Sequence, residues 1–284
     1  MGMRWWGPGP DDFTRLVRFH SIRPVVVADL GRPVQRRMLR SRMASDSLIA
    51  SRLMARGRGA EGFIVLAPHR IPPSLLGWMK KRGPVTAWLG DEPVGARAVR
   101  FPMSAFTRVA CADPRWVPGS AWLPWPHLVP QPLTERISEG TSDTFVMVGT
   151  AYPDRVELAR SVHRTGRLSM CVGSGWPDDL PAVPPMGRVE TLAWLKGREV
   201  TVLNVPHRQM LRTYNPFFFD LAAAGIPQIV MAPPGPFRSA LDVADRRVRP
   251  KELRDARVAP SVTRQLQAEV LAHHSVDTRL ETLL

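Results

Sequence analysis

The chain has 284 residues, of which 44% are hydrophobic, and its 39 lysines and arginines give it a formal net charge of +14. A chain of this length and hydrophobicity can build one large or two modest globular domains. No run of about 18 uncharged apolar residues occurs, so the sequence predicts no transmembrane helix. The first residues, MGMRWWGPGPDD, lack the apolar core of a secretory signal. Two widely separated cysteines, Cys111 and Cys171, show no metal-ligand spacing, so we expect a cytoplasmic protein with buried, reduced thiols.

The positive charge is carried mainly by arginine, which makes up 35 of the 39 basic residues and fits a GC-rich coding bias. Eight of these arginines gather between residues 32 and 58 against the single acid Asp46. The cluster fits a solvated helix face, and it also fits a weak contact with an anionic membrane surface or an acidic acceptor. Because arginine is otherwise spread along the chain, we expect no specific nucleic-acid partner.

Apolar runs alternate with helical patterns in the first half, which predicts a small parallel α/β domain. The predicted strands are Pro24–Leu30, Phe63–Ala67, Val85–Leu89 and Phe106–Ala112, and the predicted helices include Pro33–Arg56 and Pro73–Lys81. The tryptophan- and proline-rich stretch Trp116–Pro130 reads as a last strand and linker. For its aromatic rings we favour packing over an acceptor-binding platform.

Two side chains of this half follow a predicted strand and are candidates for a catalytic base. Asp91 comes directly after Val85–Leu89, and His69 comes after Phe63–Ala67. The carboxyl ends of parallel strands face the ligand crevice of α/β sheets, so either group is placed to accept a proton. Capping of the next element is the alternative for Asp91, which is our first choice.

The second half repeats the α/β pattern after the polar stretch 131–143. The predicted strands are Thr144–Val148, Leu168–Val172, Val200–Val205 and Gln228–Ala232, and the predicted helices are Arg155–Arg164, Glu190–Lys196, Pro216–Gly225 and Ser261–Leu284, the last as one long helix. Gly225 is expected to cap its helix, and Ile226–Pro227 to stop it.

The most informative stretch is Thr201–Val230, which runs strand, basic polar loop, helix and strand. Such a loop and helix N-terminus lie at the carboxyl edge of a parallel sheet, where α/β folds bind phosphates. Arg212 in this loop suits a phosphate because a guanidinium is always charged and donates two parallel hydrogen bonds. An ordinary αβ unit with solvated arginines, and for His207 a surface histidine, are the alternatives.

The segment Phe219-Asp220-Leu-Ala-Ala-Ala-Gly-Ile-Pro resembles the E-A-x-A-x-G-x-P signature of GT-B glycosyltransferases, with Asp220 at the glutamate position, one methylene shorter. The fuller run from Asn204 to Asp220 resembles the spore-maturation (CgeB-like) glycosyltransferase family. Phe145–Arg155 is similar to the opening of that family's donor domain, and His274–Leu284 to its C-terminal helix.

The resemblance implies two facing Rossmann-like domains. Residues 1–138 would form the acceptor side, 139–262 would bind the donor, and a C-terminal helix, 263–284, would cross back to the first domain. Asp220 would hold the donor ribose, Arg212 would stabilise the diphosphate leaving group, and Trp176 would pack a base beside Gly173, which permits close approach. The expected donor-binding residues are Gly149, Thr150, Arg155, Gly173, Trp176, Asn204, His207, Tyr214, Asn215, Phe219, Asp220 and Gly225.

The activity that follows is transfer of a sugar from a nucleotide-diphosphate donor to a hydroxyl of a small-molecule, peptide or lipid-linked acceptor. No Asp-x-Asp occurs, and the adjacent pairs Asp11–Asp12 and Asp178–Asp179 splay apart, so we expect neither a metal nor another cofactor. The expected location is cytoplasmic, extending to the inner membrane face through the arginine cluster. Two alternatives remain, a non-catalytic sugar-nucleotide binder and a basic nucleic-acid or membrane-surface protein.

Overall fold

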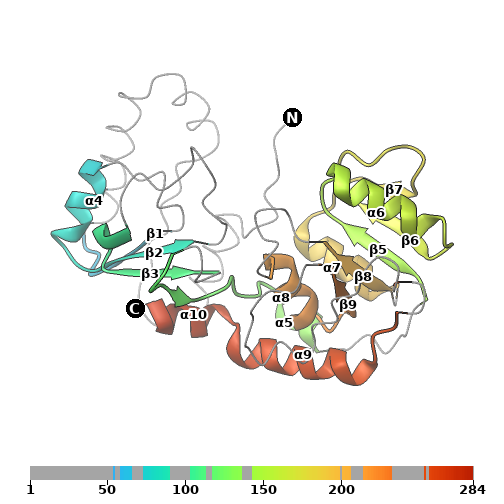
Figure 1. Cartoon of the computed structure of the whole chain (residues 1–284). Helices are drawn as coiled ribbons and strands as arrows, with labels where there is room; N and C mark the ends of the chain where they lie inside the picture. Colours follow the sequence, from blue (N-terminus) through green and yellow to red (C-terminus); the bar gives the residue numbers. More distant parts are fainter. Residues whose placement is uncertain are drawn as a thin grey trace. The chain divides into compact units, whose positions relative to one another are not determined.

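The computed structural model describes residues 54, 58–65, 73–89, 103–112, 117–135, 143–198, 200–205, 214–231, 253 and 256–283. They belong to two compact units, each with its own sheet (Figure 1). The five-stranded unit contains Trp125–Ser275, and the four-stranded unit contains the described residues up to Pro124 together with Val276–Leu284. All strand pairs in both sheets are parallel, so the predicted α/β class with parallel sheets is confirmed.

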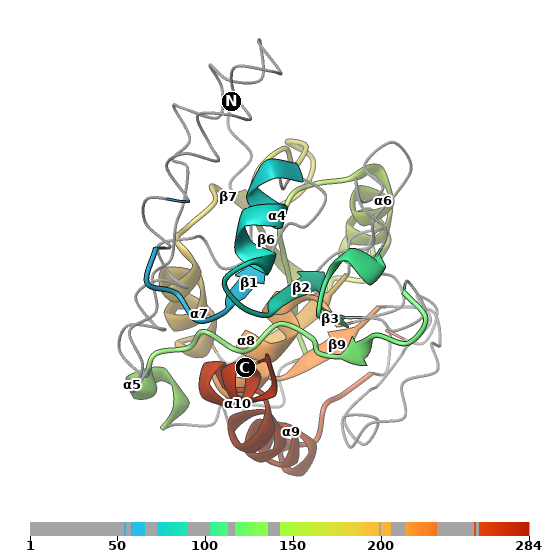
Figure 2. The ribbon, with the colours of Figure 1, turned by 90° about the vertical axis from the view of Figure 1, so that its left-hand side faces the viewer.

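The four-stranded sheet follows the order of the chain. Its strands are β1 (Phe63–Val65), β2 (Val85–Leu89), β3 (Arg108–Cys111) and β4 (Ala121–Trp122), and a 3-10 helix, η3 (Met103–Ala105), precedes β3. Helix α4 (Pro73–Lys80) packs beside β2 (Figure 2) and buries Leu75 and Leu76 against Val85 and Ala87. The predicted strand Pro24–Leu30 and nearly all of the predicted helix Pro33–Arg56 lie outside the described residues.

The five-stranded sheet has the order β7-β6-β5-β8-β9. Its strands are β5 (Phe145–Val148), β6 (Leu168–Val172), β7 (Ala182–Val183), β8 (Thr201–Asn204) and β9 (Gln228–Val230). Numbered along the chain from β5, the spatial order is third, second, first, fourth, fifth, which is the Rossmann-like doubly wound arrangement. The chain therefore reverses direction across the sheet between β5 and β8, and this topological switch point positions the candidate site.

The helices of the five-stranded unit are α5 (Gln131–Thr134), α6 (Pro153–His163), α7 (Arg188–Lys196), α8 (Pro216–Ala223) and α9 (Pro260–His273). Helix α8 is buried from Phe217 to its end, as expected of a helix whose residues are apolar except for Asp220. It ends as predicted at Gly225, which has a φ of 65°. The N–H of Ile226 donates to Leu221 O and that of Gly225 to Ala222 O, both at 2.9 Å, which is a Schellman motif.

The prediction of one helix over Ser261–Leu284 is wrong, because two helices occupy this stretch. Helix α9 ends at His273, and α10 (Val276–Leu283) begins three residues later. Tertiary contacts hold the break: the carbonyl of His274 accepts a hydrogen bond from the N–H of His127 at 2.9 Å. The imidazole of His274 lies 5.0 Å from the ring of Phe219. Helix α10 then packs in the four-stranded unit, where Thr86 Oγ1 donates to Leu283 O at 3.3 Å.

Candidate functional site

The candidate site lies where β5 and β8 run side by side, in the register Phe145↔Thr201 to Met147↔Leu203. From β5 the chain continues toward β6 on one side, and from β8 it continues toward β9 on the other. The loops that leave the carboxyl ends of these two strands therefore part from each other. In doubly wound sheets this parting forms the crevice that receives a ligand.

The loops after β5 and β6 each contain a glycine, and these glycines allow the two backbones to approach each other closely. Gly149 has a φ of 128°, and its N–H donates to Val172 O at 2.8 Å. Gly173, in the loop after β6, has a φ of 143°, and a Cβ there would lie 2.0 Å from Gly149 O. The two loops are joined again where Ala151 N–H donates to Ser174 O at 3.0 Å. The positive φ favours glycine at both 149 and 173, and at 173 a Cβ would also collide with the backbone of Gly149.

The turn from β5 into α6 offers the N–H of Thr150 to a ligand. Helix α6 has Tyr152 at its N-cap, with no side-chain capping bond. Among the described residues none accepts a hydrogen bond from the N–H of Thr150. The first amides of a helix carry a partial positive charge and are a ready anion-binding group. Both α6 and α8 begin with a proline, Pro153 and Pro216, which has no N–H. Helix α8 differs in its cap, since Asn215 Oδ1 accepts from Phe218 N–H at 2.8 Å.

Arg155 lies in the first turn of α6 and is 9% exposed. Its Nη1 donates to Thr150 O at 3.1 Å, and its Nη2 donates to Val205 O. Burial lowers the pKa of the Arg155 guanidinium, and the charge of Asp154 opposes that effect only in part. An arginine stays protonated at neutral pH despite such a shift, so a positive charge is held at the switch point.

Trp176 belongs to the loop after β6, and its indole is partly buried. Its Nε1 donates to Gly149 O at 3.0 Å, and the ring packs against the core cluster that includes Phe145 and Cys171. In this arrangement the indole N–H is used within the protein. The predicted packing of Trp176 on a nucleobase stays a prediction.

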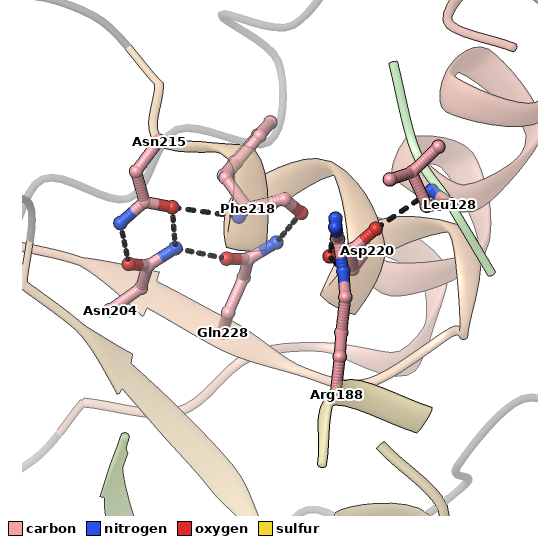
Figure 3. A network of polar contacts seen from close by, with 7 residues as sticks. All are labelled: Leu128, Arg188, Asn204, Asn215, Phe218, Asp220 and Gln228. Atoms are coloured by element: carbon pink, nitrogen blue, oxygen red, sulfur yellow. Dashed lines mark hydrogen bonds and ion pairs between the residues drawn. The ribbon is translucent and has the colours of Figure 1, made fainter. Parts of the chain in front are cut away.

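Three carboxamides join the end of β8, the start of α8 and the start of β9 (Figure 3). Asn215 Nδ2 donates to Asn204 Oδ1 at 2.6 Å, and Asn204 Nδ2 donates to Gln228 Oε1 at 3.0 Å. Gln228 Nε2 donates to the carbonyl of Phe218 at 2.9 Å. Both hydrogens of the Asn204 amide are used, because it also donates to Asn215 Oδ1 at 3.3 Å. These amides fix the backbone on either side of residues 206–213.

Asp220 is fully buried, and Leu128 and Arg188 are among the residues that bind its carboxylate (Figure 3). The N–H of Leu128 donates to its Oδ1 at 2.9 Å, and Arg188 Nε donates to its Oδ2. Arg188 Nη2 also forms an ion pair with Oδ2, while its buried Nη1 has no hydrogen-bond partner among the residues that the structure describes. The predicted ribose contact of Asp220 stays a prediction, and these partners give the carboxylate a structural role in addition.

Three further residues of the predicted donor set lie in the interior. Tyr214 is 2% exposed and stacks on Phe218 with ring centroids 4.2 Å apart. Phe219 is fully buried beside the ring of His274, and Gly225 ends α8. These positions explain the motif by packing and helix capping.

The structure brings together Gly149, Thr150, Arg155, Gly173 and Trp176 at the β5 and β6 loops, and Asn204 with Asn215 at β8. His207, Arg212, Asp91 and His69 lie outside the described residues. Arg188, Gln228 and Leu128 were not predicted. The role of Gln228 could have been predicted, because it is a polar residue at the start of an otherwise apolar strand and lies on the same face of the sheet as Asn204. Nothing in the sequence indicated the roles of Arg188 or of the Leu128 backbone.

Within the described part of the chain, no group of three or more His, Cys, Asp or Glu residues is arranged to hold a metal ion. No helix in that part is long and apolar enough to cross a membrane.

No family model matches the sequence, and no curated protein sequence matches it. Among solved structures, the chain is similar to the glycotransferase of kitacinnamycin, with 12% sequence identity and a TM-score of 0.44. The match covers 92% of this chain and 84% of that one. A likeness of this size carries no argument about this chain, so its activity has to be argued from the site.

Proposed function

We propose that the protein is a glycosyltransferase that moves a sugar from a nucleotide-diphosphate donor to an acceptor hydroxyl. The observation that carries the proposal is the β5–α6 turn at the switch point. There Gly149, the N–H of Thr150, the N-terminal end of α6 and the Arg155 cation converge on one edge of a doubly wound sheet. Backbone amides, a helix N-terminus and a fixed cation are the groups that stabilise a diphosphate.

The remaining parts of the proposal follow the resemblance stated from the sequence. The arrangement would be of the GT-B type, with residues 139–262 binding the donor, 1–138 binding the acceptor, and 263–284 crossing back. Arg212 and His207 would complete the diphosphate contact, and Asp220 the ribose contact. No metal or cofactor would take part, and the acceptor would be a small molecule, a peptide or a lipid-linked compound.

The first test is a thermal-shift screen against UDP, GDP and dTDP, because a ligand that binds the native state raises its melting temperature. At least one diphosphate should stabilise the protein, and Arg212→Ala should weaken that binding by about 1.5–3 kcal/mol, the scale of a hydrogen bond to a charged group. Arg164→Ala, an exposed arginine just beyond α6, is the control for overall charge. No stabilisation by any of the three would count against the proposal.

The catalytic base is tested separately, once an acceptor is identified. Asp91→Asn keeps the shape of the side chain and removes its basicity, and it should slow turnover about 10²-fold or more. His69→Ala is the competing variant. If only His69→Ala has the effect, His69 is the base.

A second candidate function is a non-catalytic sugar-nucleotide binder. It is favoured by the occupancy of Asp220, whose two oxygens already accept from Leu128 and Arg188. A binder would show the same diphosphate stabilisation but no loss of donor over time. Following donor consumption with several acceptors and with water separates the two.

A further inference from the structure

Arg155 lies between the two loops that part at the switch point. Its Nη1 donates to the carbonyl of Thr150 in the loop after β5. Its Nη2 donates to the carbonyl of Val205, the residue that follows β8. Fifty residues of sequence separate Arg155 from Val205. A guanidinium is a rigid planar fork, so holding both carbonyls fixes the distance between the loops.

The backbone around Arg155 is shaped to admit its guanidinium. A Cβ at Gly149 would lie 2.6 Å from Nη1 and 3.5 Å from Cζ. The ring of Tyr152 lies beneath the same group, with Cζ 5.4 Å from the ring centroid. The positive φ favours glycine at 149, and a side chain there would push the guanidinium out of its position.

Within the described part of the chain, the guanidinium of Arg155 has no carboxylate as a direct partner. By contrast, Arg160 on the same helix pairs with Asp179 at 2.7 Å. Two carbonyl dipoles are its acceptors. A buried cation with only dipolar partners is stabilised by an anion placed nearby.

We propose that Arg155 is a positioning residue, which clamps the carbonyls of Thr150 and Val205 so that the two loops present one fixed surface to the donor diphosphate. This role rests on the nucleotide-sugar function proposed above. It differs from direct phosphate binding because the guanidinium donors are spent on the loops, and the turn they hold supplies the amides.

The test compares Arg155→Met with Arg160→Met, which removes a charge from the same helix outside the loops. Two quantities are measured on the full chain: amide hydrogen exchange without ligand, and the Kd for UDP, GDP and dTDP well below the melting temperature. Arg155→Met should speed exchange in peptides covering 149–152 and 200–205 but not in α9. It should also raise the diphosphate Kd about tenfold or more, with Arg160→Met close to wild type.

Arg155→Lys should recover part of both effects, because an ammonium can reach one of the two carbonyls. Gly149→Ala keeps the arginine but sets a methyl group 2.6 Å from Nη1, so it should reproduce the loosened loops if Arg155→Met does not fold.

Unchanged exchange in both loops of Arg155→Met would overturn the clamp. A weaker diphosphate Kd without faster exchange would also overturn it, since that pattern belongs to direct phosphate contact. Faster exchange with an unchanged Kd would limit Arg155 to stability and equally refute a positioning role. If the wild-type protein binds none of the three diphosphates, the proposed function is refuted instead. The wild type therefore tests the proposed function, and the Arg155→Met variant tests the clamp.

Discussion

Asn204 and Asn215 are joined by reciprocal side-chain hydrogen bonds, with Asn215 Nδ2 donating at 2.6 Å and Asn204 Nδ2 donating at 3.3 Å. The pair joins the end of β8 to the start of α8, because Asn204 is the last residue of β8 and Asn215 caps α8. The basic residues His207 and Arg212 fall between them in the sequence. The backbone entering and leaving the proposed diphosphate loop is therefore fixed by uncharged groups.

Asn215→Ala should lower the free energy of unfolding by about 1–3 kcal/mol, because it removes both a helix cap and the contact with Asn204. Urea denaturation measures this loss. Asn204→Ala is the partner variant, and the double mutant should lose less than the sum of the two, with a coupling of about 0.5 kcal/mol or more. Strict additivity would mean that the two amides do not stabilise each other.

Asp220→Asn and Arg188→Met should each cost about 3–5 kcal/mol of stability, because each leaves the other charge buried without its partner. Differential scanning calorimetry measures the loss. The double variant Asp220→Asn with Arg188→Met should be less destabilised than the sum of the two, since no unpaired charge remains.

The same two variants test the ribose contact. If Asp220 also holds the donor ribose, Asp220→Asn should weaken nucleoside binding more than Arg188→Met does, with both measured well below their melting temperatures. Equal affinities would remove Asp220 from the ribose contact and leave it as a support for the segment around Leu128.

Diphosphate binding and sugar transfer should persist in EDTA, since the sequence offers no Asp-x-Asp for a divalent ion. Isothermal titration with and without EDTA, followed by a donor-consumption assay, makes the comparison. Complete loss of transfer, restored by Mn²⁺, would reveal a carboxylate pair assembled by the fold.

Cys171 should resist alkylation in the native protein at pH 8. It is fully buried in β6, and burial raises the pKa of its thiol from 9.0 to about 12. Alkylation needs the thiolate, which is scarce under these conditions. Iodoacetamide labelling followed by mass spectrometry, in a Cys111→Ala background, should show slow reaction that becomes fast in urea. Rapid native labelling would mean that β6 opens readily.

The same shift makes stability depend on alkaline pH. Between pH 9 and 12 the unfolded chain gives up the Cys171 proton while the folded chain keeps it, so the unfolded state is favoured as the pH rises. The contribution of this thiol is fully present below pH 9 and is lost through that window. Cys171→Ala should remove this part of the alkaline destabilisation.

Much of the fold could be predicted because its signals are local. The apolar runs at Val85–Leu89 and Leu168–Val172 are strands with the predicted bounds, and Gly225 ends α8 as predicted. Strand β2 is buried along its whole length, which needs a short continuous apolar run, and a helix end that requires a positive φ favours glycine.

The rest depends on contacts between distant segments. The break between α9 and α10 has neither proline nor glycine to mark it, and it forms where His127 bonds to His274. Leu128 and Arg188, which bind Asp220, lie 92 and 32 residues away in the sequence. The motif therefore predicted a ligand contact for Asp220 and gave no indication of its ion pair with Arg188. The acceptors of Arg155 are backbone carbonyls, which leave no trace in the identities of Thr150 and Val205.

The four-stranded unit has a consequence for synthesis on the ribosome. Its strands lie before Pro124, yet Thr86 Oγ1 donates to Leu283 O and Arg279 Nε donates to Pro124 O at 3.0 Å. Translation delivers the 151 residues of Trp125–Ser275 before these groups can meet. The unit that emerges first is thus the last to be completed, and a chain that ends after residue 275 carries all strands of both sheets but lacks α10.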